Sequence, residues 1–217
     1  MTEINLLDRY PRSQRPIEER GSVITEEIRR VARQYGEEFF DGDRLYGYGG
    51  YSYDGRWVPI AERIRDYYGL TGTSTVLDIG CAKGFLMHDL EQVVPGLRSY
   101  GVDVSHYAIH HGMEEVKPRL AVADASRLPF PDDSFDVVLS INSLHNLPAA
   151  ACRESLREVM RVSRGQAFVT VDAWRDEPER QRLMQWMLTA ETYMSVDDWK
   201  QFFGDAGYTG DFYWFFP

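Results

Sequence analysis

The segment Val76-Leu-Asp-Ile-Gly-Cys-Ala-Lys-Gly84 decides how this chain folds. A mostly apolar run from Thr75 to Ile79 ends in a glycine-rich turn, which is typical of a buried strand that leads into a helix. The pattern that follows predicts this helix from about Lys83 to Val93, where Pro95 and Gly96 break it. A strand, a tight turn and a helix in this order are the beginning of a βαβ unit.

Strands and helices go on alternating after this segment. Further strands are predicted at residues 99–104, 120–123, 135–141, 166–171 and 211–216, and further helices at residues 105–115, 148–162, 177–189 and 196–206. Such alternation is typical of an α/β fold in which helices cover both faces of a doubly wound, mostly parallel sheet. We therefore predict a Rossmann-like fold with a sheet of about six strands.

Residues 1–69 lack this regular pattern and are predicted to form an N-terminal helical extension of a catalytic domain at residues 70–217. Helical spacing of apolar residues predicts one helix at 17–40 and a short one at 59–68. The segment Tyr46–Trp57 between them is rich in glycine and aromatic residues. We interpret it as a lid that closes over a site and excludes water, or alternatively as an aromatic loop packed on the domain surface.

The charge of the chain argues against some partners. Its 34 acidic residues outnumber its 24 basic ones, the formal net charge is −10, and the pI is about 5.0. Because an acidic surface repels phosphate backbones and anionic lipids, neither nucleic acid nor a membrane is expected as a partner. The arginine-rich stretch Arg9–Arg20 is interrupted by Glu18 and Glu19, so we interpret it as a solvated or docking arm.

Other features of the sequence suggest a soluble intracellular protein without a metal. No apolar run has the length of a membrane span, and the N-terminus lacks a signal-peptide core, so a cytoplasmic location is expected. Cys81 and Cys152 are expected to be buried free thiols. No cluster of histidines and carboxylates has convincing ligand spacing, so no metal is predicted.

Polar residues stand directly after four consecutive strands, where open parallel sheets bind their ligands. Asp78 and the glycine turn belong to the first strand, Asp103 ends the second, Asp124 follows the third, and Asn142 follows the fourth. Each of these residues taken alone has a simple structural role as a turn or cap residue. Their joint placement at successive strand ends predicts one shared binding site.

In these motifs the chain resembles the class I S-adenosylmethionine-dependent methyltransferases, in particular the type with a Leu-Pro-Phe-Pro-Asp-Asp-Ser-Phe-Asp segment before the fourth strand, here Leu128–Asp136. The resemblance covers about residues 70–172. It implies an enzyme that moves the methyl group of S-adenosylmethionine to a small-molecule acceptor by in-line displacement and releases S-adenosylhomocysteine. O-transfer is slightly favoured over N- or C-transfer, and the acceptor and the oligomeric state are left open.

The chain departs from the family pattern in three places. The pattern acid-x-Gly-x-Gly-x-Gly has Ala82 in place of its middle glycine, and because alanine does not readily take a positive φ, we expect this position to lie outside the left-handed region. Lys83 replaces a small hydroxyl residue and is expected to be solvated. Family members commonly finish with a hairpin of two strands, whereas one strand ends this chain. We therefore expect the last strand to be antiparallel, at or near the edge beside the fifth.

The resemblance also implies how the donor is held. Amide groups of the turn at 80–84 would bind its carboxylate at a helix N-terminus, with Asp78 close to its ammonium. Asp103 would accept hydrogen bonds from the ribose hydroxyls, and Asp124 from the adenine amino group. The residues expected to bind the cofactor are Asp78, Gly80, Cys81, Ala82, Gly84, Asp103, Val104, Asp124, Ala125, Ser140 and Asn142.

His145 is the candidate catalytic base. It follows the fourth strand, where the family presents the methyl group, and its ordinary pKa suits proton transfer at neutral pH. A structural histidine bonded to a nearby carbonyl is an equally simple interpretation. Arg56 is expected to meet a carboxylate or phosphate of the substrate. The residues expected to bind the substrate are Tyr46, Tyr48, Tyr51, Arg56, Trp57 and Tyr193.

Two other functions compete with this prediction. An NAD-dependent oxidoreductase has the same architecture, but its Gly-x-Gly-x-x-Gly turn needs a second glycine at the pyrophosphate, where this chain has Ala82, and Gly84 follows too early. A non-catalytic domain of the same fold that binds a partner is the third candidate. The presence of Asp78 and Asp103 argues against it, because a scaffold needs no carboxylate matched to a ribose.

Overall fold

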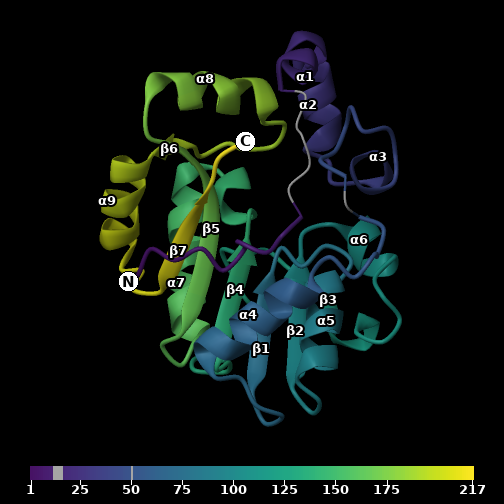
Figure 1. The fold of residues 1–217 in the computed structure, drawn as a ribbon, viewed down its shortest axis with the longest axis vertical. Coiled ribbons are helices and arrows are strands. Elements are labelled where there is room, and N and C mark those ends of the chain that lie inside the picture. The colour runs from purple at the N-terminus through teal and green to yellow at the C-terminus, as the bar shows by residue number, and fades with distance from the viewer. Residues whose placement is uncertain (12–16, 50) are drawn as a thin grey trace.

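A seven-stranded sheet with helices on both faces forms the centre of the molecule (Figure 1). The computed structural model describes residues 1–11, 17–49 and 51–217. Gly50 of the segment Tyr46–Trp57 and residues 12–16 of the expected arm lie outside the described residues. The strands are β1 (Thr75–Ile79), β2 (Arg98–Asp103), β3 (Leu120–Val122), β4 (Val137–Ile141), β5 (Ala167–Trp174), β6 (Met194–Ser195) and β7 (Asp211–Phe215).

The order of the strands confirms the predicted doubly wound, Rossmann-like fold. The order is β3-β2-β1-β4-β5, and both β6 and β7 pair with β5. The chain moves outward from β1 to β3 on one side and returns to β4 on the other. The order therefore reverses between β1 and β4, and ligands of open α/β sheets bind at the carboxyl ends of the strands beside such a point.

The last strand, β7, runs parallel to β5, so the expectation of an antiparallel last strand was wrong. Phe168 pairs with Asp211, and Asp172 pairs with Phe215. The reason is β6, a short strand that the sequence analysis missed, which pairs with the carboxyl end of β5. Because a helix then carries the chain back to the start of β5, the strand that follows must run in the same direction as β5.

The helices between the strands are α4 (Val58–Tyr68), α5 (Phe85–Val93), α6 (His106–His110), α7 (Ala149–Val162), α8 (Glu177–Trp186) and α9 (Val196–Ala206), with short 3₁₀ turns at Lys117–Arg119 (η1) and Leu144–Asn146 (η2). One face of the sheet packs against α4 and α5, and the other face packs against α7 and α9. The helix predicted for residues 105–115 is shorter and ends at His110. The buried residues on both faces explain why the central strands read as continuous apolar runs.

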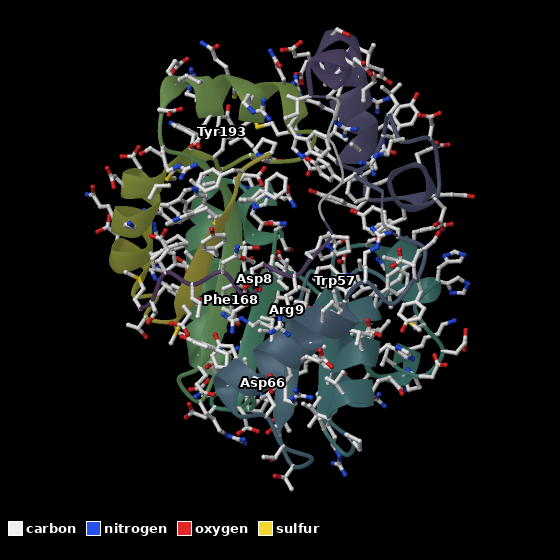
Figure 2. The ribbon with its side chains drawn as sticks, viewed as in Figure 1. Asp8, Arg9, Trp57, Asp66, Phe168 and Tyr193 are labelled. Carbon is white, nitrogen blue, oxygen red and sulfur yellow. The ribbon has the colours of Figure 1, made fainter. Side chains whose placement is uncertain are left out.

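The first residues of the chain lie against the sheet. The amide of Ile4 donates to the Phe212 carbonyl at 2.9 Å, and the amide of Phe212 donates to the Thr2 carbonyl at 3.0 Å. Leu6 is fully buried in the cluster between the sheet and α4. This segment then crosses in front of the sheet, where Figure 2 labels Asp8 and Arg9. It therefore covers backbone groups of β7 that an edge strand would leave exposed.

The helices α1 to α3 of the extension lie beyond the carboxyl ends of the strands (Figure 1). The single helix predicted for residues 17–40 is three helices, α1 (Ile17–Val23), α2 (Glu26–Ala32) and α3 (Glu37–Phe40). Thr25 starts α2 because its side chain accepts the Ile28 amide. Tyr35, with a φ of 47°, turns the chain out of α2. The three short helices allow the extension to bend over the end of the sheet, which a straight helix would not.

Arg20 is buried, so the arm that was expected to be solvated or docked is docked at this residue. Its guanidinium donates to the carbonyls of Arg44, Gly47 and Trp186, and it lies 4.8 Å from the Trp186 ring. Burial lowers its pKa. Three elements that are distant in sequence, namely α1, the start of the segment Tyr46–Trp57 and the end of α8, are thus joined by one side chain.

Candidate functional site

The turn between β1 and α5 requires glycine at two positions. The amides of Gly80 and Cys81 both donate to the Val102 carbonyl of β2, at 2.8 and 3.1 Å. Gly80 has a φ of 79°, and a Cβ atom there would lie 2.1 Å from Ser143 Oγ. Gly84, also at 79°, is the N-cap of α5, and a Cβ atom there would lie 2.8 Å from Val116 Cγ2. The turn therefore follows a fixed path between β2 and the residues after β4.

Ala82 has a φ of 49°, so the expectation that this position avoids the left-handed region was wrong. The tertiary structure supplies the reason. The Ala82 amide donates to Oδ2 of Asp103 at 2.9 Å, and this bond holds the turn against the end of β2. A left-handed conformation costs a residue with a Cβ atom about 1 kcal/mol, which the charge-assisted bond offsets.

We expect Ala82→Gly to leave the free energy of unfolding unchanged or to raise it by up to about 1 kcal/mol. Glycine removes the cost of the left-handed φ, but it also gives the unfolded chain more freedom, which opposes the gain. Chemical denaturation of the variant and the wild type measures the difference. A loss of more than about 1 kcal/mol would show that the methyl group of Ala82 makes stabilising contacts that outweigh its backbone strain.

Two buried carboxyl groups stand beside this turn. Asp78, on β1, is 5% exposed, and burial raises its pKa to about 7, with a further contribution from the charge of Asp103. Asp103, at the end of β2, accepts the Ser105 amide through Oδ1 at 2.8 Å and the Ala82 amide through Oδ2. Burial raises its pKa, and these amides oppose the rise. Two acidic groups within electrostatic reach of each other, in a buried place, favour a ligand that carries positive charge and hydroxyl groups.

The raised pKa of Asp78 predicts that stability and ligand affinity change in opposite directions with pH. Because an unfolded aspartate has a pKa of about 3.9, the folded chain binds the extra proton between about pH 4 and 7, and the free energy of unfolding falls as the pH rises across this range. A cationic ligand favours the ionised carboxylate. The affinity of the protein for such a ligand should therefore rise by up to about tenfold per pH unit as the pH rises toward 7.

Calorimetric titration with S-adenosylmethionine at several values between about pH 5.5 and 7 measures this dependence. Asp78→Asn removes the titrating group, so the variant should bind with an affinity that does not change over the same range. An equally steep dependence in the variant would show that another group titrates.

The residues after β3 are more exposed than those after β1 and β2. Asp124 is exposed, and its Oδ1 accepts the amide and the hydroxyl of Ser126, both at 2.8 Å. Val104 is 59% exposed, and Ala125 is partly buried at the rim of the main core. The Asp124 carboxylate therefore stabilises the turn that it belongs to, and its role toward an adenine stays a prediction.

The end of β4 brings two further predicted residues to the same edge of the sheet. Asn142 has a φ of 51°, its amide donates to the Thr170 carbonyl at 3.1 Å, and its Oδ1 accepts the Thr170 hydroxyl at 2.9 Å. Ser140 is fully buried, and its hydroxyl has no hydrogen-bond partner among the described residues. Asn142 is thus held by β5, so its side chain has a defined direction.

His145 lies in η2, directly after β4, and is 4% exposed. Its Nε2 is 3.5 Å from Oδ1 of Asp172, which is itself 4% exposed near the end of β5. Burial lowers the pKa of His145, and the negative charge of Asp172 opposes this shift. The imidazole is therefore neutral near pH 7, which is the form that accepts a proton.

Tyrosines of the extension cover this edge of the sheet. Tyr48, Tyr51 and Tyr46 belong to one apolar cluster with Ala82 of the glycine turn. The Tyr48 hydroxyl accepts the Leu188 amide at 2.7 Å. Burial raises the pKa of Tyr51, and the charge of Asp103 adds to the rise. Tyr46, Tyr48 and Tyr51 thus pack beside the glycine turn, and the action of their segment as a lid stays a prediction.

The remaining residues that were expected to bind substrate are less close to this edge. Arg56 makes an ion pair with Asp54 in its own loop, at 2.5 Å. The Trp57 ring packs on that of Tyr10, with 4.9 Å between ring centres. Tyr193 belongs to a separate cluster beside α8, and Figure 2 shows it far from Trp57. The structure therefore does not bring Tyr193 together with the lid.

Lys83 is buried, so the expectation of a solvated lysine was wrong. Its Nζ is 2.5 Å from Oδ1 of Asp41, and Oδ2 of Asp41 accepts the Tyr107 hydroxyl at 2.7 Å. The nearby lysine lowers the pKa of Asp41 against the effect of burial. Lys83 therefore joins the glycine turn to the end of α3. The unusual residue type at position 83 was the one sequence signal of this contact.

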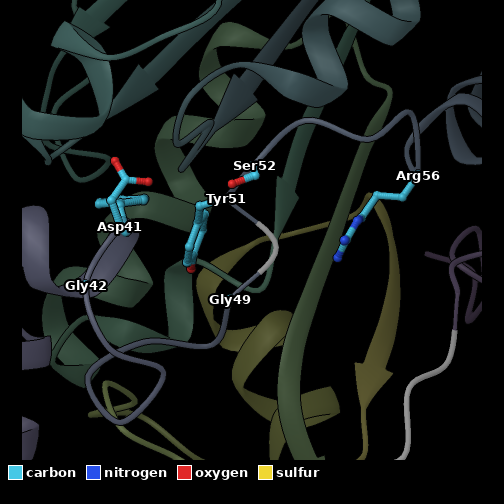
Figure 3. Close-up of a pocket in the computed structure, with 7 residues that line it drawn as sticks. Asp41, Gly42, Gly49, Tyr51, Ser52 and Arg56 are labelled. Carbon is cyan, nitrogen blue, oxygen red and sulfur yellow. The ribbon is translucent and has the colours of Figure 1, made fainter.

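A cavity of about 270 Å³ opens between the end of α3 and the lid (Figure 3). Figure 3 shows Asp41 and Tyr51 on one side of it and Arg56 on the other. Its lining residues are Phe40, Asp41, Gly42, Gly49, Tyr51, Ser52 and Arg56. All of them come from the extension, so the shape of this cavity depends on where the lid lies.

Among residues 1–11, 17–49 and 51–217, no group of three or more His, Cys, Asp or Glu side chains is placed to hold a metal ion. None of the helices described by the structure is both long and apolar enough to cross a membrane.

Part of the chain is similar to methyltransferase domains of known proteins. A protein-family model described as "Methyltransferase domain" matches residues 76–166. Sterigmatocystin 8-O-methyltransferase of Aspergillus parasiticus is 33% identical over 47% of this chain and 24% of its own length. Arginine-hydroxylase NDUFAF5 of Rattus norvegicus is 34% identical over 42% and 27%, and a tRNA (carboxymethyluridine(34)-5-O)-methyltransferase of Arabidopsis thaliana is 29% identical over 66% and 34%. The chain thus spans about a quarter to a third of the length of these relatives.

Solved structures agree on the fold. A SAM-dependent methyltransferase from Aquifex aeolicus superposes with a TM-score of 0.50 at 19% identity, over 84% of this chain and 87% of the other. At this level of identity, the likeness concerns the fold alone.

Proposed function

We propose that this chain, whose residues 76–166 belong to the class I S-adenosylmethionine-dependent methyltransferase domains, is an enzyme that transfers the methyl group of S-adenosylmethionine to a small-molecule acceptor. One observation carries the proposal. Asp78, Asp103 and the turn Gly80–Gly84 meet at the carboxyl ends of β1 and β2, and the glycine positions leave no room for side chains. Carboxylates beside a turn with little side-chain bulk suit a nucleoside with an amino-acid tail.

The residues present fit this donor. In the proposed pose, Asp103 accepts the ribose hydroxyls through lone pairs that the Ala82 and Ser105 amides leave free, since each carboxylate oxygen accepts more than one hydrogen bond. Asp78 lies near the cationic end of the donor. Amides of the first residues of α5 bind the carboxylate of the tail at the helix N-terminus, because most amides of the turn are already paired. The adenine lies beside the exposed side chain of Val104 and within reach of Asp124.

When bound, the donor supplies an activated methyl group on a sulfonium. The protein then has to hold the acceptor in line with this group and close to it, which by itself lowers the barrier by several kcal/mol, on the order of 7 or more in favourable cases. In our proposal Asn142 orients the reacting groups, and His145 takes the proton of the acceptor. The lid tyrosines Tyr48 and Tyr51 exclude water from the site.

We propose an uncharged hydroxyl compound as the acceptor, so that the reaction is O-transfer. The neutral form of the buried His145 suits a hydroxyl that must lose a proton as it is methylated. The net charge of −10 supports a small molecule rather than nucleic acid, although two relatives are named as a tRNA methyltransferase and a putative 23S rRNA methyltransferase. The cytoplasm is the proposed location, since the two cysteines are buried free thiols.

Isothermal titration separates the three candidate functions. We expect the protein to bind S-adenosylmethionine and not NAD⁺. Binding of NAD⁺ alone would favour an oxidoreductase, and binding of neither would favour a non-catalytic domain. S-adenosylhomocysteine release, measured with panels of small phenols and alcohols and separately with bulk tRNA, then tests the class of acceptor. Turnover with tRNA alone would contradict the proposed small molecule.

A further inference from the structure

His145 has an unpaired nitrogen in a place where water has little access. Its Nδ1 is buried and has no hydrogen-bond partner among the described residues, although the residue is only 4% exposed. Leaving a buried polar atom unpaired costs about 1–3 kcal/mol, and such atoms are rare in folded proteins. A buried nitrogen without a partner, next to a proposed donor site, indicates that a bound ligand supplies its hydrogen bond.

The position of His145 is nevertheless fixed. Its carbonyl accepts the amides of Glu191 and Thr192 at 3.1 and 2.9 Å, which ties η2 to the segment after α8. The hydroxyl of Thr192 donates to the Leu147 carbonyl at 2.7 Å and strengthens the same junction. The free nitrogen is therefore not the result of a loose side chain.

Asp172 faces the other ring nitrogen. It belongs to β5, which pairs with β4 on one edge and also with β7, and its carbonyl accepts the indole N–H of Trp199 at 2.9 Å. The sheet therefore fixes this carboxylate, whose Oδ1 lies 3.5 Å from Nε2 of His145. This distance is long for a hydrogen bond, but catalytic hydrogen bonds are often long in ligand-free structures and shorten in the reactive complex.

We propose that Asp172 is a positioning residue that keeps the proton of neutral His145 on Nε2, so that the lone pair of Nδ1 points to the hydroxyl of the acceptor. This inference rests on the proposed function and adds to it a tautomer, an orienting partner and a direction of proton transfer. A carboxylate accepts hydrogen bonds and cannot donate them when ionised, so its neighbour Nε2 is the nitrogen that carries hydrogen.

The transfer step then balances as follows. A lone pair of the acceptor oxygen forms the new bond to the methyl carbon while the bond from this carbon to sulfur breaks, and its electrons stay on sulfur. The O–H proton moves to Nδ1 of His145, which becomes an imidazolium with a proton on each nitrogen. The negative charge of Asp172 stabilises this cation in its buried surroundings. No oxidant or further reactant is needed.

The same arrangement selects the class of acceptor. An acceptor whose reacting group is a carboxylate or phosphate has no proton to give to Nδ1, and it would be repelled by Asp172. An uncharged phenol or alcohol donates one hydrogen bond, which is what the single lone pair accepts. We therefore expect neutral hydroxyl compounds to be methylated and carboxylic acids not to be.

Nitrogen NMR of the imidazole groups tests the tautomer without any acceptor. In wild-type protein at pH 7.5, two-bond ¹H–¹⁵N correlation spectra should show His145 as the Nε2–H tautomer. In Asp172→Asn, the side-chain amide no longer favours hydrogen on Nε2, so the tautomers should become mixed or reversed. A wild-type His145 with its proton on Nδ1, or an unchanged tautomer in the variant, would overturn the proposal.

A second aspartate–histidine pair supplies a matched control. Asp89 is fully buried, and its Oδ1 lies 3.1 Å from Nδ1 of His88 on α5. Asp89→Asn should therefore alter the signals of His88 and leave those of His145 unchanged. If both variants altered His145 alike, the effect would come from a general loosening of the fold, and Asp172 would have no specific role.

Titration of the same samples with S-adenosylmethionine keeps this inference separate from the proposed function. Wild-type protein that fails to bind the donor would contradict the proposed function, whatever the tautomer. Protein that binds the donor but holds His145 in the other tautomer would contradict the role of Asp172 alone. The Asp172→Asn variant should bind the donor with an affinity within about twofold of wild type, since the donor contacts in the proposed pose come from other residues.

Discussion

His145→Ala should lower kcat by roughly 10²- to 10⁴-fold, the usual contribution of a positioned general base. The imidazole is buried at the end of β4, its pKa is lowered by burial, and Asp172 lies 3.5 Å from Nε2. Without it, the acceptor loses the side chain that takes its proton in the proposed mechanism. The dissociation constant for S-adenosylmethionine should change by less than about threefold, because the donor contacts in the proposed pose come from other residues.

The measurement is the release of S-adenosylhomocysteine with the best acceptor from the panel, together with calorimetry for the donor. His111→Ala is a suitable control, since His111 is an exposed histidine after α6 that contacts Tyr107 and lies outside the proposed site. This control should keep wild-type turnover. Equal turnover in His145→Ala would show that His145 is structural, which is the alternative that the sequence analysis left open.

Asp103→Ala should weaken the binding of S-adenosylmethionine by roughly 10- to 100-fold, since hydrogen bonds to a charged group contribute about 1.5–3 kcal/mol. The carboxylate is buried at the end of β2 and is oriented by the Ala82 and Ser105 amides. The variant also leaves these two amides without their acceptor. We therefore expect a loss of about 1–2 kcal/mol in the free energy of unfolding beside the loss of affinity.

Asp136→Asn separates these two effects. Asp136 also accepts a backbone amide, that of Thr75 at 2.7 Å, but it stands just before β4 at the opposite end of the sheet. The Asp136→Asn variant should be less stable than wild type and should bind the donor with the same affinity. An Asp103→Ala protein with unchanged affinity would contradict the proposed position of the ribose.

The class of fold and the general position of the site followed from local patterns. Apolar runs of strand length, separated by helices of ordinary length, fix a parallel sheet because right-handed crossovers leave few other arrangements. Polar residues after successive strands then meet at one edge of the sheet. Asp78 on β1, Asp103 at the end of β2 and Asn142 after β4 are close for this reason, because β1 pairs with both β2 and β4. The family match for residues 76–166 agrees with this part of the analysis.

Contacts between distant parts of the chain decided the rest. Alanine at position 82 takes a left-handed φ only because Asp103 holds its amide, and Lys83 is buried only because Asp41 is near it. Whether the last strand runs parallel depended on β6, two residues whose pairing with β5 has no signal of its own. The pairing of His145 with Asp172 is of the same kind.

The sequence by itself therefore determined the order of strands and helices, the glycine turn and the chemical types of the residues at the strand ends. Only the tertiary structure decided which of these residues are paired, how the extension bends over them and which nitrogen of His145 is left unpaired. The physical reason is that hydrophobic periodicity is a property of neighbours along the chain, whereas the state of a buried polar group depends on every element packed around it.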